Sequence, residues 1–186
     1  GRDPTKTILS IAGTKELADD LPTLFIQAST APQKYQYMVG PARQKLIDRA
    51  DESIPYLMEM LNTELPREAL ALRDYILPKI GRRLTPQLID TLRFGQPSRQ
   101  GLTMYVLGEM KDSTAAIALG RKLIDPTNWR IRATAAEALL KMKADTARPY
   151  LIKELSDTEE IVRGSAARAL VNIDDSTELE TLILPQ

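Results

Sequence analysis

The chain has 186 residues, of which 43% are hydrophobic and 27% are charged, and it contains neither cysteine nor histidine. Without these two residue types, the usual structural zinc sites, disulfide frameworks, cysteine nucleophiles and imidazole bases are excluded. The 25 Lys and Arg residues balance 25 Asp and Glu residues, so the chain lacks the net positive charge with which general binders of nucleic acids or anionic membranes hold their partners.

No apolar run approaches the ~20 residues that cross a bilayer, and no apolar signal-peptide core follows Gly1. Because the chain does not begin with Met, we expect a trimmed or excised part of a longer protein. A chain without cysteine suits compartments on either side of a membrane. A cytoplasmic location is slightly favoured, and an extracytoplasmic one stays open.

Residues 1–41 are predicted to form an irregular N-terminal helical cap. Thr14 is the expected N-cap of a helix through residues 17–20, and Pro22 is expected to open a second helix around residues 24–26. These helices do not follow the pattern of the remaining chain, so we expect them to cap its first repeat.

Residues 42–186 contain a repeat. Similar segments start 31 or 32 residues apart, at Pro55, Pro86, Ile117, Pro149 and Glu180. A second set of similar segments lies upstream of these, most clearly at residues 131–142 and 162–173, so each repeat is predicted to hold two helices, A and then B. A period of this length indicates stacked repeats. The predicted repeats are approximately 42–62, 65–93, 97–124, 126–155 and 158–186.

The apolar spacing within the repeats is helical, and no alternating run is long enough for a sheet. In the fourth repeat the predicted buried stripe of helix A is Ala135, Ala138, Leu139 and Met142. The predicted stripe of helix B is Leu151, Ile152 and Leu155. Proline before helix B suits a first turn, where it costs no hydrogen bond. The sequence therefore predicts an all-α fold.

The motif Ile/Val-Arg-x-x-Ala-Ala-x-Ala-Leu occurs at residues 131–139 and 162–170, and Leu107-Gly108 is followed by Asp112-Ser113-Thr114. Together with the paired helices, these motifs resemble HEAT-like repeats of the phycobilin-lyase type. The resemblance covers about residues 42–186 and is strongest in the last three repeats. It implies a right-handed α-α superhelix of about five helix pairs behind the cap. It leaves function open, because such repeats serve many unrelated functions.

In HEAT-like superhelices the B helices line the concave surface, so the resemblance implies that residues beside the B stripe face a groove. The first row is Tyr56, Gln87, Ala118, Tyr150 and Thr181, and the second is Glu59, Asp90, Arg121, Lys153 and Leu184. The second row changes from acidic to basic, which suits an extended peptide or a protein helix better than a nucleic-acid backbone. The expected partner-binding residues are Tyr56, Glu59, Gln87, Asp90, Arg121, Tyr150 and Lys153.

Arg132 and Arg163 recur at one position of the repeat. A guanidinium group binds carboxylates and phosphates well, but the recurrence favours a structural ladder in which each arginine pairs with an acidic loop residue such as Asp125 or Asp157. Acidic pairs such as Asp19-Asp20 stand at apparent helix starts, where they complement the helix dipole. We therefore predict no metal site.

The expected function is a non-catalytic scaffold that binds a protein or peptide through the B helices, as a segment of a larger protein. The sequence shows no phosphate-binding loop, nucleophile elbow or dinucleotide fingerprint, and no cofactor or catalytic residue is predicted. An accessory bilin lyase or a chaperone-like factor is the alternative, because the resembling family includes bilin lyases. Nucleic-acid binding is a weaker alternative, and the oligomeric state is left open.

Overall fold

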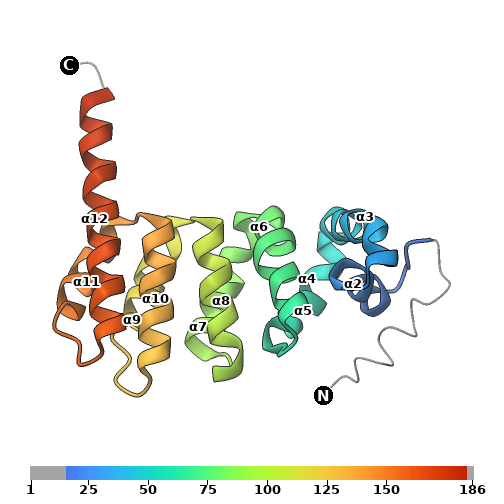
Figure 1. The fold of residues 1–186 in the computed structure, drawn as a ribbon, viewed down its shortest axis with the longest axis horizontal. Coiled ribbons are helices and arrows are strands. Elements are labelled where there is room, and N and C mark those ends of the chain that lie inside the picture. Colours follow the sequence, from blue (N-terminus) through green and yellow to red (C-terminus); the bar gives the residue numbers. More distant parts are fainter. Residues whose placement is uncertain (1–15, 184–186) are drawn as a thin grey trace. The chain divides into compact units, whose positions relative to one another are not determined.

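A computed structural model describes the backbone of residues 16–183 and the side chains of residues 16–174. Every regular element in those residues is helical, which confirms the all-α prediction (Figure 1). The chain divides into two compact units, Gly1–Ile80 and Gly81–Gln186. We call them unit 1 and unit 2 and describe each by itself.

Unit 1 contains a series of short helices, in chain order α2 (Leu21–Ser29), α3 (Gln36–Asp48), α4 (Ala50–Glu59), α5 (Pro66–Leu70) and α6 (Leu77–Ile80). Single 3-10 turns form η1 (Gln33–Tyr35) and η2 (Met60–Asn62), and the π-helical segment η3 (Ala71–Ile76) joins α5 to α6. Helix α2 packs on α3. Their fully buried side chains include Leu24, Phe25, Ala42 and Leu46.

The helix predicted at residues 17–20 is not formed, since these residues are non-helical. Asp20 is instead the N-cap of α2, and its Oδ1 atom accepts a hydrogen bond of 2.9 Å from the Thr23 backbone N–H. Such a cap satisfies a backbone donor that the helix itself leaves free. Thr14, the predicted cap, lies outside the described residues.

Unit 2 has two layers of helices (Figure 1). The A helices are α8 (Pro97–Met110), α10 (Trp129–Met142) and α12 (Glu160–Ile183), and the B helices are α7 (Thr85–Phe94), α9 (Ala116–Leu123) and α11 (Arg148–Glu154). A single 3-10 turn leads into each B helix, namely η4 (Arg82–Leu84), η5 (Ser113–Ala115) and η6 (Asp145–Ala147). Neighbouring A helices pack on one another, and α9 packs on α7, α10 and α11.

Left-handed lysines end the first two A helices of unit 2. Lys111 and Lys143 have φ angles of 52° and 54°, and their N–H groups return to the carbonyls of Leu107 and Leu139. A residue in this conformation stops a helix and satisfies one of its last carbonyls. The chain can then turn back, so that each B helix follows its A helix after one 3-10 turn.

The predicted fifth B helix, from Glu180, is not a separate helix. Helix α12 runs unbroken from Glu160 to Ile183, and its C-terminal part extends past the neighbouring helices (Figure 1). The position equivalent to Lys143 is Asp174, and residues 174–177 contain neither Gly nor Pro to interrupt the helix. The side chain of Thr181 and all of Leu184 lie outside the described residues.

The residues buried in the structure agree with the predicted apolar stripe of helix A but differ from that of helix B. In α10 all four predicted stripe residues are buried. In α11 Leu151 is buried, whereas Ile152 and Leu155 are 54% and 42% exposed. The buried face of this helix instead carries Glu154 at a core position. A search for apolar periodicity assigns such a position to the surface, which explains the shift.

Helices α9 and α11 approach closely at Gly120. A Cβ atom added there would lie 2.4 Å from Cδ2 of the Tyr150 ring, which is shorter than any normal carbon contact. Ala118, two residues earlier in α9, is also buried. The Tyr150 ring therefore packs on the glycine, and the absence of a side chain at residue 120 sets the spacing of the two B helices.

Gly120→Ala is expected to destabilise the protein by about 1–3 kcal/mol, because the new methyl group forces the Tyr150 ring out of its position. Gly101→Ala is a matched control, since Gly101 lies inside α8 with no atom within 4 Å of its added Cβ. The control is expected to gain up to about 1 kcal/mol from its better helix propensity. Urea unfolding measures both, and equal stabilities would contradict the close approach.

Candidate partner-binding site

Three adjoining pockets follow the B helices of unit 2. One lies along α7, the second joins the end of α7 to α9, and the third joins the ends of α9 and α11. The first and second share Arg93, and the second and third share Ile124, Asp125 and Pro126. The pockets are therefore continuous, and we call the depression that they form the B-helix groove.

Three of the predicted binding residues, Asp90, Arg121 and Lys153, are exposed and line this groove. Gln87 is exposed on α7 but does not line a pocket, and Tyr150 is half-buried against Gly120. The buried Ala118 also lines the groove.

The remaining two predicted residues belong to unit 1. Tyr56 is half-buried and packs edge-on against Phe25, with ring centroids 5.9 Å apart. Glu59 is exposed on α4. The structure thus brings part of the predicted set together within unit 2, and Tyr56 contributes to the packing of unit 1.

Two further residues of the groove were not predicted. Arg93 is exposed at the end of α7 and lines two of the pockets. Ile152 is exposed on α11 and lines the third. The position of Arg93, one helical turn after Asp90 on the same face, is a signal that would have found it. Ile152 was not predicted because the sequence pattern assigned it to the buried apolar stripe of helix B.

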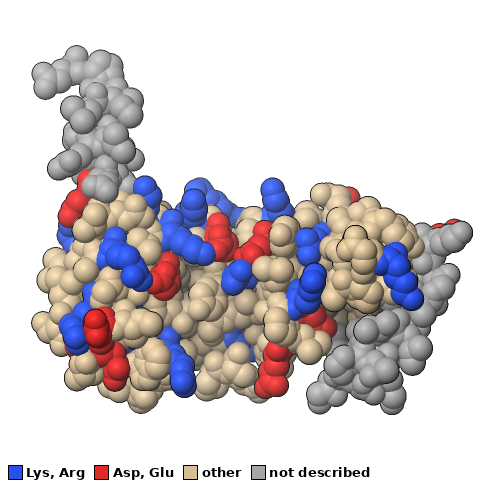
Figure 2. All heavy atoms as spheres, in the orientation of Figure 1, with Lys and Arg blue, Asp and Glu red and all other residues tan. Residues whose placement is uncertain are grey.

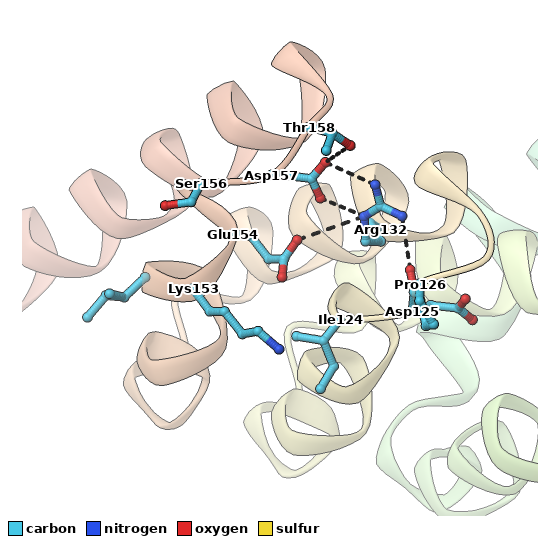
Figure 3. A pocket seen from close by; sticks show the side chains of 10 residues that line it. Ile124, Asp125, Pro126, Arg132, Lys153, Glu154, Ser156, Asp157 and Thr158 are labelled. Atoms are coloured by element: carbon cyan, nitrogen blue, oxygen red, sulfur yellow. Dashed lines mark hydrogen bonds and ion pairs between the residues drawn. The ribbon is translucent and has the colours of Figure 1, made fainter.

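Arg132 is the centre of a buried ion cluster beside the third pocket (Figure 3). Its Nε and Nη2 atoms donate hydrogen bonds to Asp157 Oδ2 and Oδ1 over 2.6 and 2.9 Å. Its Nη1 atom donates to the Asp125 carbonyl over 3.0 Å, and Glu154 Oε2 lies 3.8 Å from Nε. The three charged side chains are at most 11% exposed. Arg132 therefore binds the loops on both sides of α10.

Arg163 holds the corresponding place in α12. Its Nη1 atom donates to the carbonyls of Asp157 and Thr158 over 2.7 and 3.0 Å. In α8 the corresponding residue is Gln100, whose Oε1 atom accepts a hydrogen bond of 3.1 Å from Lys122. Arg132 thus pairs with an acidic loop side chain as the predicted ladder requires, whereas the contacts of Arg163 are to backbone carbonyls of the loop before its own helix.

The cluster separates the pKa values of its two carboxyl groups. Burial, followed by the hydrogen bond with Asp157, raises the pKa of Glu154 to about 7. The hydrogen bond from Arg132 holds the pKa of Asp157 far below its ordinary value. Asp157 is therefore ionised near neutral pH, and Glu154 titrates in that range.

Other carboxylates of the groove are also held by protein donors. Asp112 accepts hydrogen bonds from the hydroxyls of Thr85 and Thr114, over 2.7 and 2.9 Å. Although burial raises the pKa of Asp112, these bonds bring it below the ordinary value. Asp125 accepts from the hydroxyl and the N–H of Thr127, which lowers its pKa.

Three exposed cations of the groove have no such partners. Among the residues that the structure describes, Arg93, Arg121 and Lys153 form no ion pair. On the face of the A helices, acidic and basic side chains lie side by side (Figure 2), with ion pairs between Lys141 and Glu109 and between Arg168 and Glu137. The B-helix groove therefore presents positive charge that the protein itself does not neutralise.

The period, the helix pairs and the arginine contacts between repeats define a stacked helical-repeat protein. Residues 118–183 match the family model that describes HEAT repeats, which supports a HEAT-like repeat protein. The match does not distinguish the phycobilin-lyase type. No curated protein matches the chain. HEAT repeats are typically non-catalytic and commonly mediate protein interactions.

Within the described part of the chain, no three acidic side chains gather as ligands for a metal ion. The described helices also include none that is both long and apolar enough to cross a membrane.

Arg132→Ala is expected to destabilise the protein by about 3 kcal/mol or more, because it leaves Asp157 and Glu154 buried without their cation. Arg163→Ala removes only bonds to backbone carbonyls and is expected to cost about 1 kcal/mol. Chemical denaturation at pH 7 compares the two variants. Similar losses of stability in the two variants would show that Arg132 contributes no more to the packing of the repeats than Arg163 does.

Glu154→Gln is expected to change how stability depends on pH. A raised native pKa stabilises the fold fully below the ordinary value of 4.5, and this contribution is lost as the pH rises to about 7. The lowered pKa of Asp157 acts in the opposite direction, but only as the pH falls below its ordinary value of 3.8. The amide of glutamine keeps a donor for Asp157 without ionising.

The variant should therefore match the wild type near pH 5 and exceed its stability by about 1–2 kcal/mol at pH 8. Thermal unfolding across this pH range provides the measurement. Glu159→Gln, at an exposed position in the same loop, is the control and should leave the pH profile unchanged. A constant difference between the Glu154 variant and the wild type at all pH values would refute the assignment.

Proposed function

We propose that the protein is a non-catalytic scaffold, a segment of a larger protein, that binds a protein or peptide along the B-helix face. One observation carries the proposal: a continuous groove follows three helices, and its exposed Arg93, Arg121 and Lys153 form no ion pair among the described residues, while its buried carboxylates are bound internally. An extended partner can contact several repeats at once, which is the usual advantage of a stacked fold.

The chemistry of the groove favours binding over catalysis. The group with a pKa near neutrality, Glu154, is 6% exposed and is directed toward Arg132 and Asp157 (Figure 3). A general acid must reach the proton of a substrate directly or through one water, and the enclosed Glu154 is occupied by structural contacts. Its pKa is accounted for by its burial in the core of the repeat.

Nucleic acid fits the groove less well. Residues 81–153 contain 13 Lys and Arg but only 6 Asp and Glu, which gives local positive charge. None of the described residues that line the three pockets is aromatic, so the groove offers no platform on which bases stack. The exposed Asp90 also interrupts the positive charge.

Affinity capture from the native host tests this function. The wild type, an Arg121→Glu/Lys153→Glu variant and an Arg130→Glu/Lys143→Glu control serve as baits. The control changes the same charge at two exposed residues that do not line the three pockets. We expect the groove variant to retain at least about tenfold less of a defined protein, identified by mass spectrometry, than the other two baits.

Equal retention by all three baits would exclude the groove as the binding site. Capture of a coloured chromophore would favour the bilin lyase or chaperone-like alternative. Capture of nucleic acid, with retention that falls steeply as salt is added, would favour the nucleic-acid alternative.

A further inference from the structure

Each B helix of unit 2 carries one exposed cation that lines the groove and forms no ion pair among the described residues; Arg82 in η4 and the half-buried Lys122 on α9 line the groove as well. Arg93 lies on α7, Arg121 on α9 and Lys153 on α11. Arg121 and Lys153 occupy equivalent positions of consecutive repeats, 32 residues apart. Neighbouring helices pack with axes about 8–10 Å apart. The positive charges of Arg121 and Lys153 are therefore about one interhelical distance apart, and Arg93 lies one turn beyond Asp90, the residue of α7 that is equivalent to them.

The acidic residues near these cations do not neutralise them. Asp125 binds Thr127, Asp112 binds Thr85 and Thr114, and Asp157 binds Arg132. These three carboxylates are thus held at a turn or beneath the groove, and Asp90, one turn before Arg93, is the exposed acidic residue that lines the described pockets. The free charge of the groove is consequently positive, even though the whole chain has no net charge.

Between the cations the groove is partly apolar. Ile124 and Pro126 separate the second pocket from the third, and Ile152 lies beside Lys153 with 54% of its surface exposed. A matching ligand therefore carries negative charges about 9 Å apart, with apolar groups between them.

A polyproline II helix has this geometry. It has three residues per turn and rises 3.1 Å per residue, so every third side chain lies on one face about 9 Å from the next. In a β-strand, side chains on one face are about 6.6 Å apart, which does not match the helix spacing. Proline rings between the charged residues supply the apolar groups, and the preformed helix loses little entropy on binding.

We propose that the B-helix groove binds an acidic segment in the polyproline II conformation, with a carboxylate at every third residue placed on Arg93, Arg121 and Lys153. The inference rests on the proposed function and specifies the chemistry of its partner. Charge sets the orientation and the rate of association, and the spacing of the repeats selects the peptide.

Binding of synthetic peptides to the full chain tests the inference. The probe is a fluorescein-labelled peptide of four Glu-Pro-Pro repeats, and fluorescence anisotropy measures its affinity. The isomer with four consecutive glutamates followed by the prolines has the same composition and charge without the spacing. Peptides of four Gln-Pro-Pro or four Lys-Pro-Pro repeats and a single-stranded oligothymidylate complete the series.

We expect the Glu-Pro-Pro peptide to bind at least about tenfold more tightly than its isomer and the glutamine peptide, and to weaken as salt increases. Arg121→Glu/Lys153→Glu should lower its affinity at least about tenfold, whereas Arg130→Glu/Lys143→Glu should not. Circular dichroism and urea unfolding establish that each variant is folded before its binding is compared.

The alternative outcomes separate the two proposals. If the glutamine or lysine peptide binds best and the groove variant abolishes that binding, the acidic partner is wrong while the groove remains a peptide site. If the Glu-Pro-Pro peptide and its isomer with consecutive glutamates bind equally well, the inferred spacing of the carboxylates is wrong. If no peptide binds, or if oligothymidylate binds more tightly than every peptide, the acidic-segment inference fails, and the capture experiment then decides the proposed function separately.

Discussion

The geometry of unit 2 depends on the guanidinium group of Arg132. It binds the loop before α10 through the Asp125 carbonyl and the loop before α12 through the Asp157 carboxylate. Because those loops are the ends of α9 and α11, one side chain sets where two B helices stop relative to each other. In a fold where each repeat contacts only its neighbours, such a joint determines the local register. The third pocket of the groove is formed at this joint.

The same joint explains how a chain with equal numbers of acidic and basic residues acquires a charged surface. The carboxylates that stabilise turns and loops are bound to threonine hydroxyls or to Arg132. Arg93, Arg121 and Lys153 are not needed for this purpose and form no ion pair among the described residues, whereas Arg148 on α11 pairs with Asp145 and Asp174. The surface charge of the groove therefore depends on which charges the fold uses, and the total charge of the chain carries little information about it.

The sequence predicted the repeat architecture because apolar spacing and the period of 31 or 32 residues are properties of the chain itself. It did not predict the continuous α12, since the earlier A helices end at Lys111 and Lys143, and lysine carries no turn signal of the kind that glycine does. Asp90, Arg121 and Lys153 followed from the repeat alignment. Arg93 and Ile152 did not. Arg93 lies one turn beyond the aligned position of Asp90, and Ile152 was assigned to the buried face because the buried residue 154 is a glutamate and not an apolar residue.

Arg163 and Arg132 occupy equivalent positions but make different contacts. Arg163 uses only Nη1, and only on backbone carbonyls, whereas Arg132 also binds a carboxylate with Nε and Nη2. Among the described residues, those two donors of Arg163 have no acceptor. Because α12 continues where a B helix would fold back, no loop equivalent to that of Asp157 reaches these donors in the described part of the chain. The guanidinium group of Arg163 therefore holds one loop, whereas that of Arg132 joins two.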